Sequence, residues 1–280
     1  MKLIVEPDDG VKPLIKAIDS AKKSITIVVF RFDLADLEKA LKAACKRGVD
    51  VHALVAHSTS KSERPLRKLE SRLLEYGATV ARTDTDMVRY HGKLLIIDKE
   101  VLFVLGFNYT SLDIGRSRSF GIVTRKAAAV REAQRLIQAD EDRSEKFRPR
   151  KTDLVISPEN ARTRLTQFIR KARHYLLIYD SGLTDDAMIA ELRKRAKAGV
   201  RIKILGRLEK KWRGKRLKAR SLYRRLHVRA MMRDGRRAFI GSQSMRRLEL
   251  DERREVGVMV RDVAIVKRLE RIFESDWSKS

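Results

Sequence analysis

An internal repeat constrains the fold of this chain more than any other feature. Shifted by 151 residues, two long segments align without a gap, with matches that include Pro7 on Pro158, Leu14 on Leu165, Ile18 on Ile169, Gly48 on Gly199 and Leu54 on Leu205. Helical spacing and continuous β-branched runs predict helix, strand, helix, strand in each copy, in the first at 11–22, 24–32, 34–46 and 49–55. The sequence therefore predicts two similar α/β units.

A second shift, of 136 residues, extends the repeat toward the end of each copy. It places His91 on His227, Asp98 on Asp234 and Gly121 on Gly257. Two duplicated units pack naturally about a pseudo-twofold axis, which can bring one histidine from each to the interface. We expect an α/β fold of two α/β/α halves, with mixed β-sheets flanked by helices. The halves are predicted at 1–150 and 151–280, divided in the polar stretch 141–151.

The matched histidines lie in YHGKLLIID and LHVRAMMRD, each two residues before a cation. Alternate side chains of a strand share a face, so His91 should lie beside Lys93, and His227 beside Arg229. A neutral imidazole next to a fixed cation suits attack on a phosphorus whose anionic oxygens the cation holds. Asp98 and Asp234 fall on the opposite face at expected hairpin turns, and we interpret both as structural.

Small polar residues follow each motif and are candidate phosphate ligands. Asn108 lies 17 residues after His91, and Ser242 and Ser244 lie 15 and 17 residues after His227. Glu255 lies 28 residues after His227, where the first copy has Ser119. A carboxylate bonded to one ring nitrogen fixes the tautomer and stabilises the imidazolium. We therefore expect Glu255 to orient His227, and His91 to lack such support from its own half.

These motifs resemble those of the phospholipase D superfamily, and its bacterial cardiolipin-synthase-like branch in particular. The resemblance extends through both halves and includes GFNYTSLDI and GSQSMRRLELDERREVGV. It implies an α/β/α sandwich in which both motifs form one site without a metal or cofactor. One histidine becomes phosphorylated, and the other protonates the leaving group and then activates water or an alcohol. The resemblance leaves open which of the two is the nucleophile.

Four positions depart from the family pattern. Arg229 replaces a lysine, Ser244 an asparagine, Gly106 a serine and Ser119 a glutamate. Arginine keeps the charge and binds phosphate bidentately, but its head group is bulkier than an ammonium. Two histidines and two cations remain, which suffices for the chemistry.

Charge predicts the class of partner. The chain has 64 Lys+Arg against 37 Asp+Glu, a net charge of +27. Residues 1–150 contribute +8 and residues 151–280 contribute +19. Such a field attracts polyanions, meaning an anionic membrane surface or nucleic acid. The basic segment 206–227, with Trp212 and Tyr223, could form a helix lying on a bilayer, contact a phosphate backbone, or be a solvated surface.

Other features limit the remaining options. The longest apolar run, 25–30, is far too short to span a bilayer, and the single cysteine, Cys45, suits a reducing compartment. We expect a cytoplasmic protein with peripheral membrane contact, active as a monomer through its internal repeat. No zinc motif or cysteine cluster occurs, and His52, His57 and His174, which do not recur in the repeat, are interpreted as structural.

Three functions remain open on this basis. The first is a phosphodiesterase or phosphatidyl transferase acting on phospholipids. The second is a metal-independent nuclease with the same chemistry. The third is a catalytically degenerate module that binds polyanions or membranes.

Overall fold

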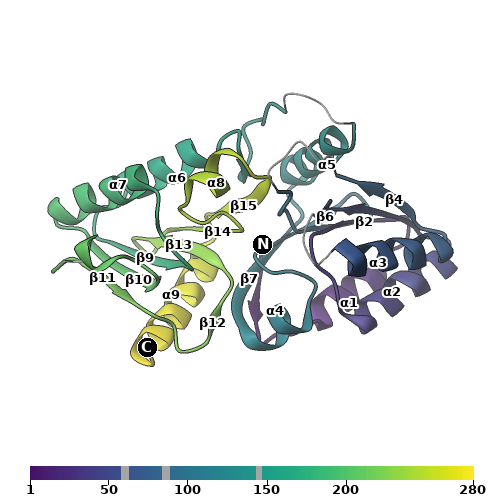
Figure 1. Ribbon diagram of the computed structural model, residues 1–280, viewed down its shortest axis with the longest axis horizontal. Helices are drawn as coiled ribbons and strands as arrows, with labels where there is room; N and C mark the ends of the chain where they lie inside the picture. Colours follow the sequence, from purple (N-terminus) through teal and green to yellow (C-terminus); the bar gives the residue numbers. More distant parts are fainter. Residues whose placement is uncertain (58–62, 84–88, 143–146, 213) are drawn as a thin grey trace.

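The computed structural model describes residues 1–280 except 58–62, 84–88, 143–146 and 213. Figure 1 shows two lobes, each with a twisted sheet and helices packed against it. The first lobe contains, in chain order, β1 (Lys2–Glu6), α1 (Lys12–Ser20), β2 (Ser24–Val29), α2 (Ala35–Lys46), β3 (Asp50–Val55), α3 (Glu63–Glu75), β4 (Thr79–Arg82), β5 (Leu94–Ile97), β6 (Val101–Leu105), α4 (Ser111–Arg116), β7 (Ser117–Thr124) and α5 (Ala127–Glu141).

The second lobe follows the same order, except that a 3₁₀ turn, η1 (Lys210–Trp212), replaces α3 and a short strand, β12 (Arg225–Leu226), is added. It contains β8 (Leu154–Ser157), α6 (Ala161–Arg170), β9 (Tyr175–Asp180), α7 (Asp186–Lys197), β10 (Arg201–Gly206), η1, β11 (Leu217–Arg220), β12, β13 (Arg229–Arg233), β14 (Arg237–Gly241), α8 (Arg247–Asp251), β15 (Glu255–Val260) and α9 (Val263–Ser278). The predicted helices and strands of the first copy are α1, β2, α2 and β3, with ends that differ by up to three residues.

The two sheets have the same strand order. It is β1-β7-β6-β5-β2-β3-β4 in the first and, position for position, β8-β15-β14-β13-β9-β10-β11 in the second. Strands β2, β3 and β4 are parallel, and the others are antiparallel to their neighbours. The predicted α/β class with mixed sheets and flanking helices is therefore confirmed. The division at residue 150 stays a prediction, and part of the proposed boundary, 143–146, lies outside the described residues.

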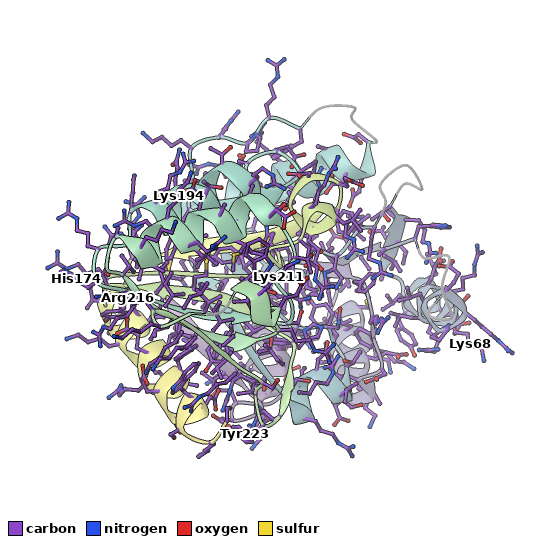
Figure 2. The ribbon with its side chains drawn as sticks, turned by 60° about the vertical axis from the view of Figure 1, so that its left-hand side comes forward. Lys68, His174, Lys194, Lys211, Arg216 and Tyr223 are labelled. Carbon is purple, nitrogen blue, oxygen red and sulfur yellow. The ribbon has the colours of Figure 1, made fainter. Side chains whose placement is uncertain are left out.

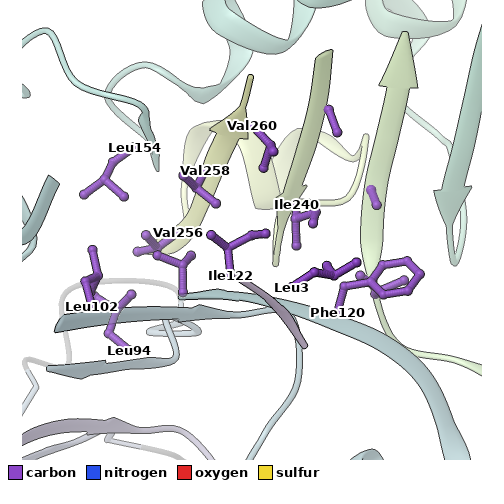
Figure 3. Close-up of a cluster of buried hydrophobic side chains, with 14 of the residues drawn as sticks. Leu3, Leu94, Leu102, Phe120, Ile122, Leu154, Ile240, Val256, Val258 and Val260 are labelled. Atoms are coloured by element: carbon purple, nitrogen blue, oxygen red, sulfur yellow. The ribbon is translucent and has the colours of Figure 1, made fainter. Parts of the chain in front are cut away.

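A shared hydrophobic core joins the lobes. Figure 3 shows Leu94, Phe120 and Ile122 of the first sheet facing Ile240 and Val256 of the second. Each fully buried aliphatic side chain stabilises by about 1.5–3 kcal/mol, whereas an exposed ion pair contributes about 0–1 kcal/mol. This core therefore holds the lobes together far more strongly than their surface charges do. Two further cores lie on the outer faces of the sheets, under α1, α2 and α3 and under α6 and α7.

The lobes also exchange short backbone pairings. Strand β12 of the second lobe pairs with β7 of the first, so that Leu226 lies opposite Arg118. At the equivalent place in the other direction, Tyr90 forms a bridge with Arg254. Each pairing immediately precedes a motif histidine. The residues leading into both motifs are therefore held by the opposite lobe.

The basic segment 206–227 is not one helix. It forms η1, β11 and β12, with Arg213 outside the described residues. Gly214, exposed and without a nearby side chain, lies at the break between η1 and β11. The helical interpretation of this segment is wrong. No helix among the described residues combines the length and apolar character needed to cross a bilayer.

Candidate active site

The His91 imidazole is hydrogen-bonded to a carboxylate of the opposite lobe. Its Nδ1 lies 2.8 Å from Oε2 of Glu255, the first residue of β15. The carboxylate is fully buried, and the imidazole is 12% exposed. The His91 N–H donates to the Arg254 carbonyl at 2.8 Å, so the backbone also holds this ring against Glu255. The expectation that Glu255 orients His227 is therefore wrong.

Glu255 contacts His91 because the residue before each motif histidine pairs with the opposite lobe. The pairing that brings Tyr90 beside Arg254 also brings the next residues, His91 and Glu255, together. By the same symmetry the His227 N–H donates to the Arg118 carbonyl, at 3.2 Å, so the residue that follows, Ser119, takes the place equivalent to Glu255. The Ser119 hydroxyl is buried and has no hydrogen-bond partner among the described residues.

His227 uses a different acceptor. Its Nδ1 lies 2.9 Å from the Gly106 carbonyl oxygen, and a carbonyl can only accept, so Nδ1 carries a proton. Its Nε2 lies 3.3 Å from an Asp113 carboxylate oxygen and 3.4 Å from the Asn108 amide nitrogen. The Asn108 amide also donates to Asp113, at 2.7 Å. Asn108 thus contacts the histidine of the other lobe, and its role as a phosphate ligand stays a prediction.

Asp113 was not among the residues singled out from the sequence. It is the third residue of α4 and almost fully buried. The shift of 136 places it on Glu249, and both carboxylates accept a backbone N–H, from Asn108 at 3.0 Å and from Ser244 at 2.7 Å. That recurrence of acidic residues was the available signal.

Two cations occupy equivalent positions beside the histidines. Lys93 Nζ donates to the His91 carbonyl at 2.7 Å, and an Arg229 guanidinium nitrogen donates to the His227 carbonyl at 2.6 Å. Among the described residues Lys93 has no carboxylate within ion-pair distance, and Arg229 lies 3.8 Å from Glu249. Lys93 precedes β5, whereas Arg229 begins β13. Both cations therefore have donors left for an anion.

Burial and these cations set the protonation of the site. Burial lowers the pKa of His91 well below its usual value, and Lys93 and Arg229 add to the effect. Burial also lowers the pKa of His227 to about 3, an effect that Asp113 opposes and the two cations reinforce. Both rings are therefore neutral in the free site at neutral pH. In neutral His91, Nδ1–H donates to Glu255 and Nε2 is an unprotonated nucleophile.

The other two groups titrate near neutrality. Burial raises the pKa of Glu255 to about 7, against the effect of Lys93. Burial lowers the pKa of Lys93 to about 7, against the effect of Glu255. The ionised carboxylate and the protonated amine thus coexist best close to pH 7.

The predicted serine ligands are occupied by other contacts. The Ser242 hydroxyl bonds to the Val256 backbone, accepting from its N–H at 3.2 Å. The Ser244 hydroxyl is fully buried and donates to Asp180. The structure therefore does not present the Ser244 hydroxyl as a phosphate ligand.

Asp98 and Asp234 lie at turns away from the histidines. Both have φ of 52°. Asp98 accepts backbone N–H groups of 22–24 at 2.7–3.1 Å, and Asp234 those of 173–175 at 2.8–2.9 Å. These carboxylates hold the hairpin turns against the start of β2 and β9.

An aromatic ring missing from the predicted set also contacts His91. The Phe30 ring meets the imidazole edge to face at a centroid separation of 4.6 Å. Lys93 Nζ lies 5.4 Å from the same ring centroid. Phe30 directly follows β2, and no sequence spacing distinguishes it from other core aromatics. It limits the rotation of the imidazole and covers one side of it.

Comparison with known proteins identifies the family of the chain. The family model described as "Cardiolipin synthase, PLD-like domain" matches residues 14–140 and 165–277. The mitochondrial cardiolipin hydrolase of Mus musculus is 26% identical over 124 residues, which are 44% of this chain and 54% of that protein. The chain thus aligns with only about half the length of this curated relative.

Solved structures share the fold at low identity. The polyphosphate kinase of Porphyromonas gingivalis has a TM-score of 0.79 and 19% identity, covering 98% of this chain and 49% of that one. The phosphatidylserine synthase of Haemophilus influenzae Rd KW20 has a TM-score of 0.72 and 10% identity, covering 96% and 84%. At these identities the likeness concerns the fold alone. Since the family model matches most of both lobes, the chain belongs to the phospholipase D superfamily, among its cardiolipin-synthase-like members.

Proposed function

We propose that the protein is a metal-independent phosphodiesterase or phosphatidyl transferase that acts on phospholipids through a phosphohistidine. The observation that carries the proposal is the contact between His91 Nδ1 and Glu255, with the second imidazole, Asp113 and two cations at the same site. Two imidazoles and a pair of cations meet the needs of phosphoryl transfer, in which positioning and charge stabilisation dominate.

His91 is the better nucleophile of the two. Its Nδ1–H faces a carboxylate, which stabilises the cationic ring that forms when Nε2 bonds to phosphorus. Lys93 and Arg229 would bind the anionic phosphoryl oxygens, with Asn108 as a further donor.

His227 is the general acid. Its two nitrogens face oxygen acceptors, the Gly106 carbonyl and the Asp113 carboxylate, so both N–H groups of the protonated ring would have a partner. A bound phosphodiester anion offsets the nearby cations that lower the pKa of His227, so protonation becomes easier with substrate present.

The steps balance as follows. His91 Nε2 forms a bond to phosphorus while the P–O bond to the alcohol breaks, and the alcohol oxygen takes the Nε2 proton of His227. Water or a second alcohol then gives a proton to His227 and attacks phosphorus, and the P–N bond breaks. Water gives hydrolysis, and an alcohol gives transfer.

The lipid substrate is supported by the description of the family and by the name of the mouse relative. We propose that the cationic surface docks on an anionic membrane, and that a single chain suffices because both lobes contribute to one site. Figure 2 shows exposed cations of both lobes, among them Lys68 of α3 and Lys194 of α7. The net charge of +27 favours nuclease activity as the second candidate.

A parallel assay tests the proposal. The protein is incubated in EDTA with vesicles of phosphatidylcholine, vesicles of phosphatidylglycerol, and single-stranded DNA. Phosphatidate or a transferred head group supports the lipid function, and loss of turnover in His91→Ala with retained vesicle binding links it to this site. Cleaved DNA with intact lipid would replace it with a nuclease. Binding without any cleavage would leave the degenerate polyanion-binding module.

A further inference from the structure

A second basic site lies beside the proposed active site. A cavity of about 420 Å³ opens where the parallel strands β9 and β10 end, and the loop that leads into β12 forms its wall. Four arginines, defined here as the arginine pocket, line it: Arg207, Arg224, Arg225 and Arg246. In open α/β sheets, ligands bind outside the carboxyl ends of parallel strands. The position alone therefore marks this cavity as a candidate binding site.

The pocket is joined to the catalytic residues. Arg225 and Leu226 line it and directly precede His227. The Arg225 guanidinium donates to Asp113, whose other oxygen lies 3.3 Å from His227 Nε2. A group bound in the pocket would thus be a neighbour of the group bound at the histidines.

The charge of the pocket is only partly balanced, since Arg225 alone of the four arginines pairs with a described carboxylate, that of Asp113. No acidic residue is among those that line it. Arg246 donates to the Gly182 carbonyl, and Arg224 lies over the Tyr223 ring. Within the described part of the chain, neither Arg207 nor Arg224 forms an ion pair with a carboxylate. Gathering guanidinium groups without an anion is unfavourable, and a phosphate matches their donor geometry bidentately.

The fold does not require these arginines. The repeat places Arg207 on Ala56 and Arg246 on Thr110, although the strands and helices around them correspond. A pocket that served only the architecture would have the same character in both lobes. Arg207 and Arg246 thus have no basic counterpart in the first lobe, whereas Arg225 falls on Arg89.

The lining also indicates the kind of phosphate. Leu222 and Leu226 contribute apolar surface, and no aromatic side chain is among the lining residues. Sites for single-stranded nucleic acid usually stack bases on aromatic rings. The Tyr223 ring lies outside this lining and is 44% exposed, with Arg224 and Lys279 at 4.7 and 6.0 Å from its centroid. These features favour a lipid phosphate over a nucleotide.

We propose that the arginine pocket binds a second phosphate group, distinct from the one attacked by histidine. Its source is either a second phosphate on the lipid substrate or free phosphate. The inference rests on the proposed function for its lipid source, and the pocket itself can be tested without turnover.

The test compares two double variants of equal charge change. Arg207→Gln with Arg224→Gln removes two unpaired pocket cations that we assign no catalytic role. Arg236→Gln with Arg268→Gln removes two exposed cations elsewhere on the second lobe and is the matched control. Thermal melting first establishes that both variants fold.

The first measurement is kinetic. Vesicles of equal surface charge carry either diphosphatidylglycerol, with two phosphates, or phosphatidylglycerol, with one. The pocket variant should raise KM for the two-phosphate lipid about tenfold, and change that for the one-phosphate lipid less than about twofold. The control should alter neither. Equal losses on both lipids, or an equal loss in the control, would exclude the lipid source.

The second measurement is direct binding of pyrophosphate by calorimetry. The pocket variant should bind about tenfold more weakly than wild type, and the control unchanged. Loss of pyrophosphate binding without a change in lipid preference would assign the pocket to free phosphate. Unchanged lipid preference and pyrophosphate binding would overturn the proposal. If wild type cleaves no lipid, the proposed function fails, and this second measurement alone decides the pocket.

A third arm uses a single-stranded oligonucleotide. Weaker oligonucleotide binding in the pocket variant, with lipid and pyrophosphate unaffected, would replace the phosphate-lipid occupant with nucleic acid and overturn the inference.

Discussion

His91 and His227 occupy equivalent positions in two lobes of identical strand order, yet their Nδ1 atoms face different acceptors. His91 faces the Glu255 carboxylate at 2.8 Å, and His227 faces the neutral Gly106 carbonyl at 2.9 Å. A carboxylate stabilises a positive ring that persists, as in a covalent intermediate, whereas a carbonyl mainly fixes the tautomer. Duplication thus gave two similar imidazoles, and substitutions around them gave each Nδ1 a different hydrogen-bond acceptor.

Two buried arginine–aspartate pairs, called the anchors here, are by contrast equivalent in the two lobes. Arg254 bonds to Asp140 at 2.9 Å, and its repeat counterpart Arg118 bonds to Asp276 at 2.8 Å. Each pair is buried and joins the two lobes, and each arginine carbonyl accepts from a motif histidine. Both histidines are thus held by the backbone of the opposite lobe, whereas only His91 has a carboxylate at its Nδ1.

The largest effect should separate the roles of the two histidines. His91→Ala should lower turnover of a lipid about 10⁴-fold or more, whatever the leaving group, because the nucleophile is gone. His227→Ala should lower it about 10²–10⁴-fold for an alkoxide leaving group, but much less for p-nitrophenol, which needs no proton. Steady-state rates on a phosphatidyl alcohol and a p-nitrophenyl phosphodiester measure this. If His91→Ala, rather than His227→Ala, kept its rate on the p-nitrophenyl substrate, the nucleophile and general acid would have to be exchanged.

The second largest effect on rate should come from the Glu255 carboxylate, which accepts from His91. Glu255→Gln should lower kcat/KM about a hundredfold, since the amide cannot stabilise the cationic ring as a carboxylate does. In wild type, kcat/KM should fall below pH 7, where Glu255 gains a proton, and above pH 7, where Lys93 loses one. The variant should lose the acidic limb of this profile.

Ser119→Ala is the control at the equivalent position. Its buried hydroxyl has no partner among the described residues, so removing it should leave rate and pH profile within about twofold of wild type. A loss comparable to that of Glu255→Gln would show that both rings depend on this position.

The smallest effect on rate should come from the anchors. Arg254→Lys and Arg118→Lys should each lower kcat about tenfold, because lysine cannot replace the two N–H groups that each guanidinium donates to its aspartate. The lost buried hydrogen bond should also cost about 1–3 kcal/mol of unfolding free energy in each variant. Denaturant unfolding and kcat together test this. Stability lost without any change in kcat would reduce the anchors to a purely structural role.

Much of the fold was predictable because the repeat extends over both lobes. The gapless shifts predicted α1, β2, α2 and β3, and the structure places His91, His227, Lys93 and Arg229 close enough to interact electrostatically. The partner of Glu255 was not predictable from spacing, since distance along the chain does not tell which lobe an interface strand faces. Strand β12, with two residues, is too short to leave a hydrophobic pattern. The aspartate at 113 was missed because its counterpart, Glu249, is a different acid.

The backbone pairings between the lobes, β12 with β7 and Tyr90 with Arg254, constrain the evolution of the sequence. A substitution in the last strand of one copy is felt by the imidazole of the other copy, as Ser119 illustrates for His227. The two copies therefore cannot drift independently. Neither lobe, expressed alone, would have the backbone contacts that hold its own histidine in place.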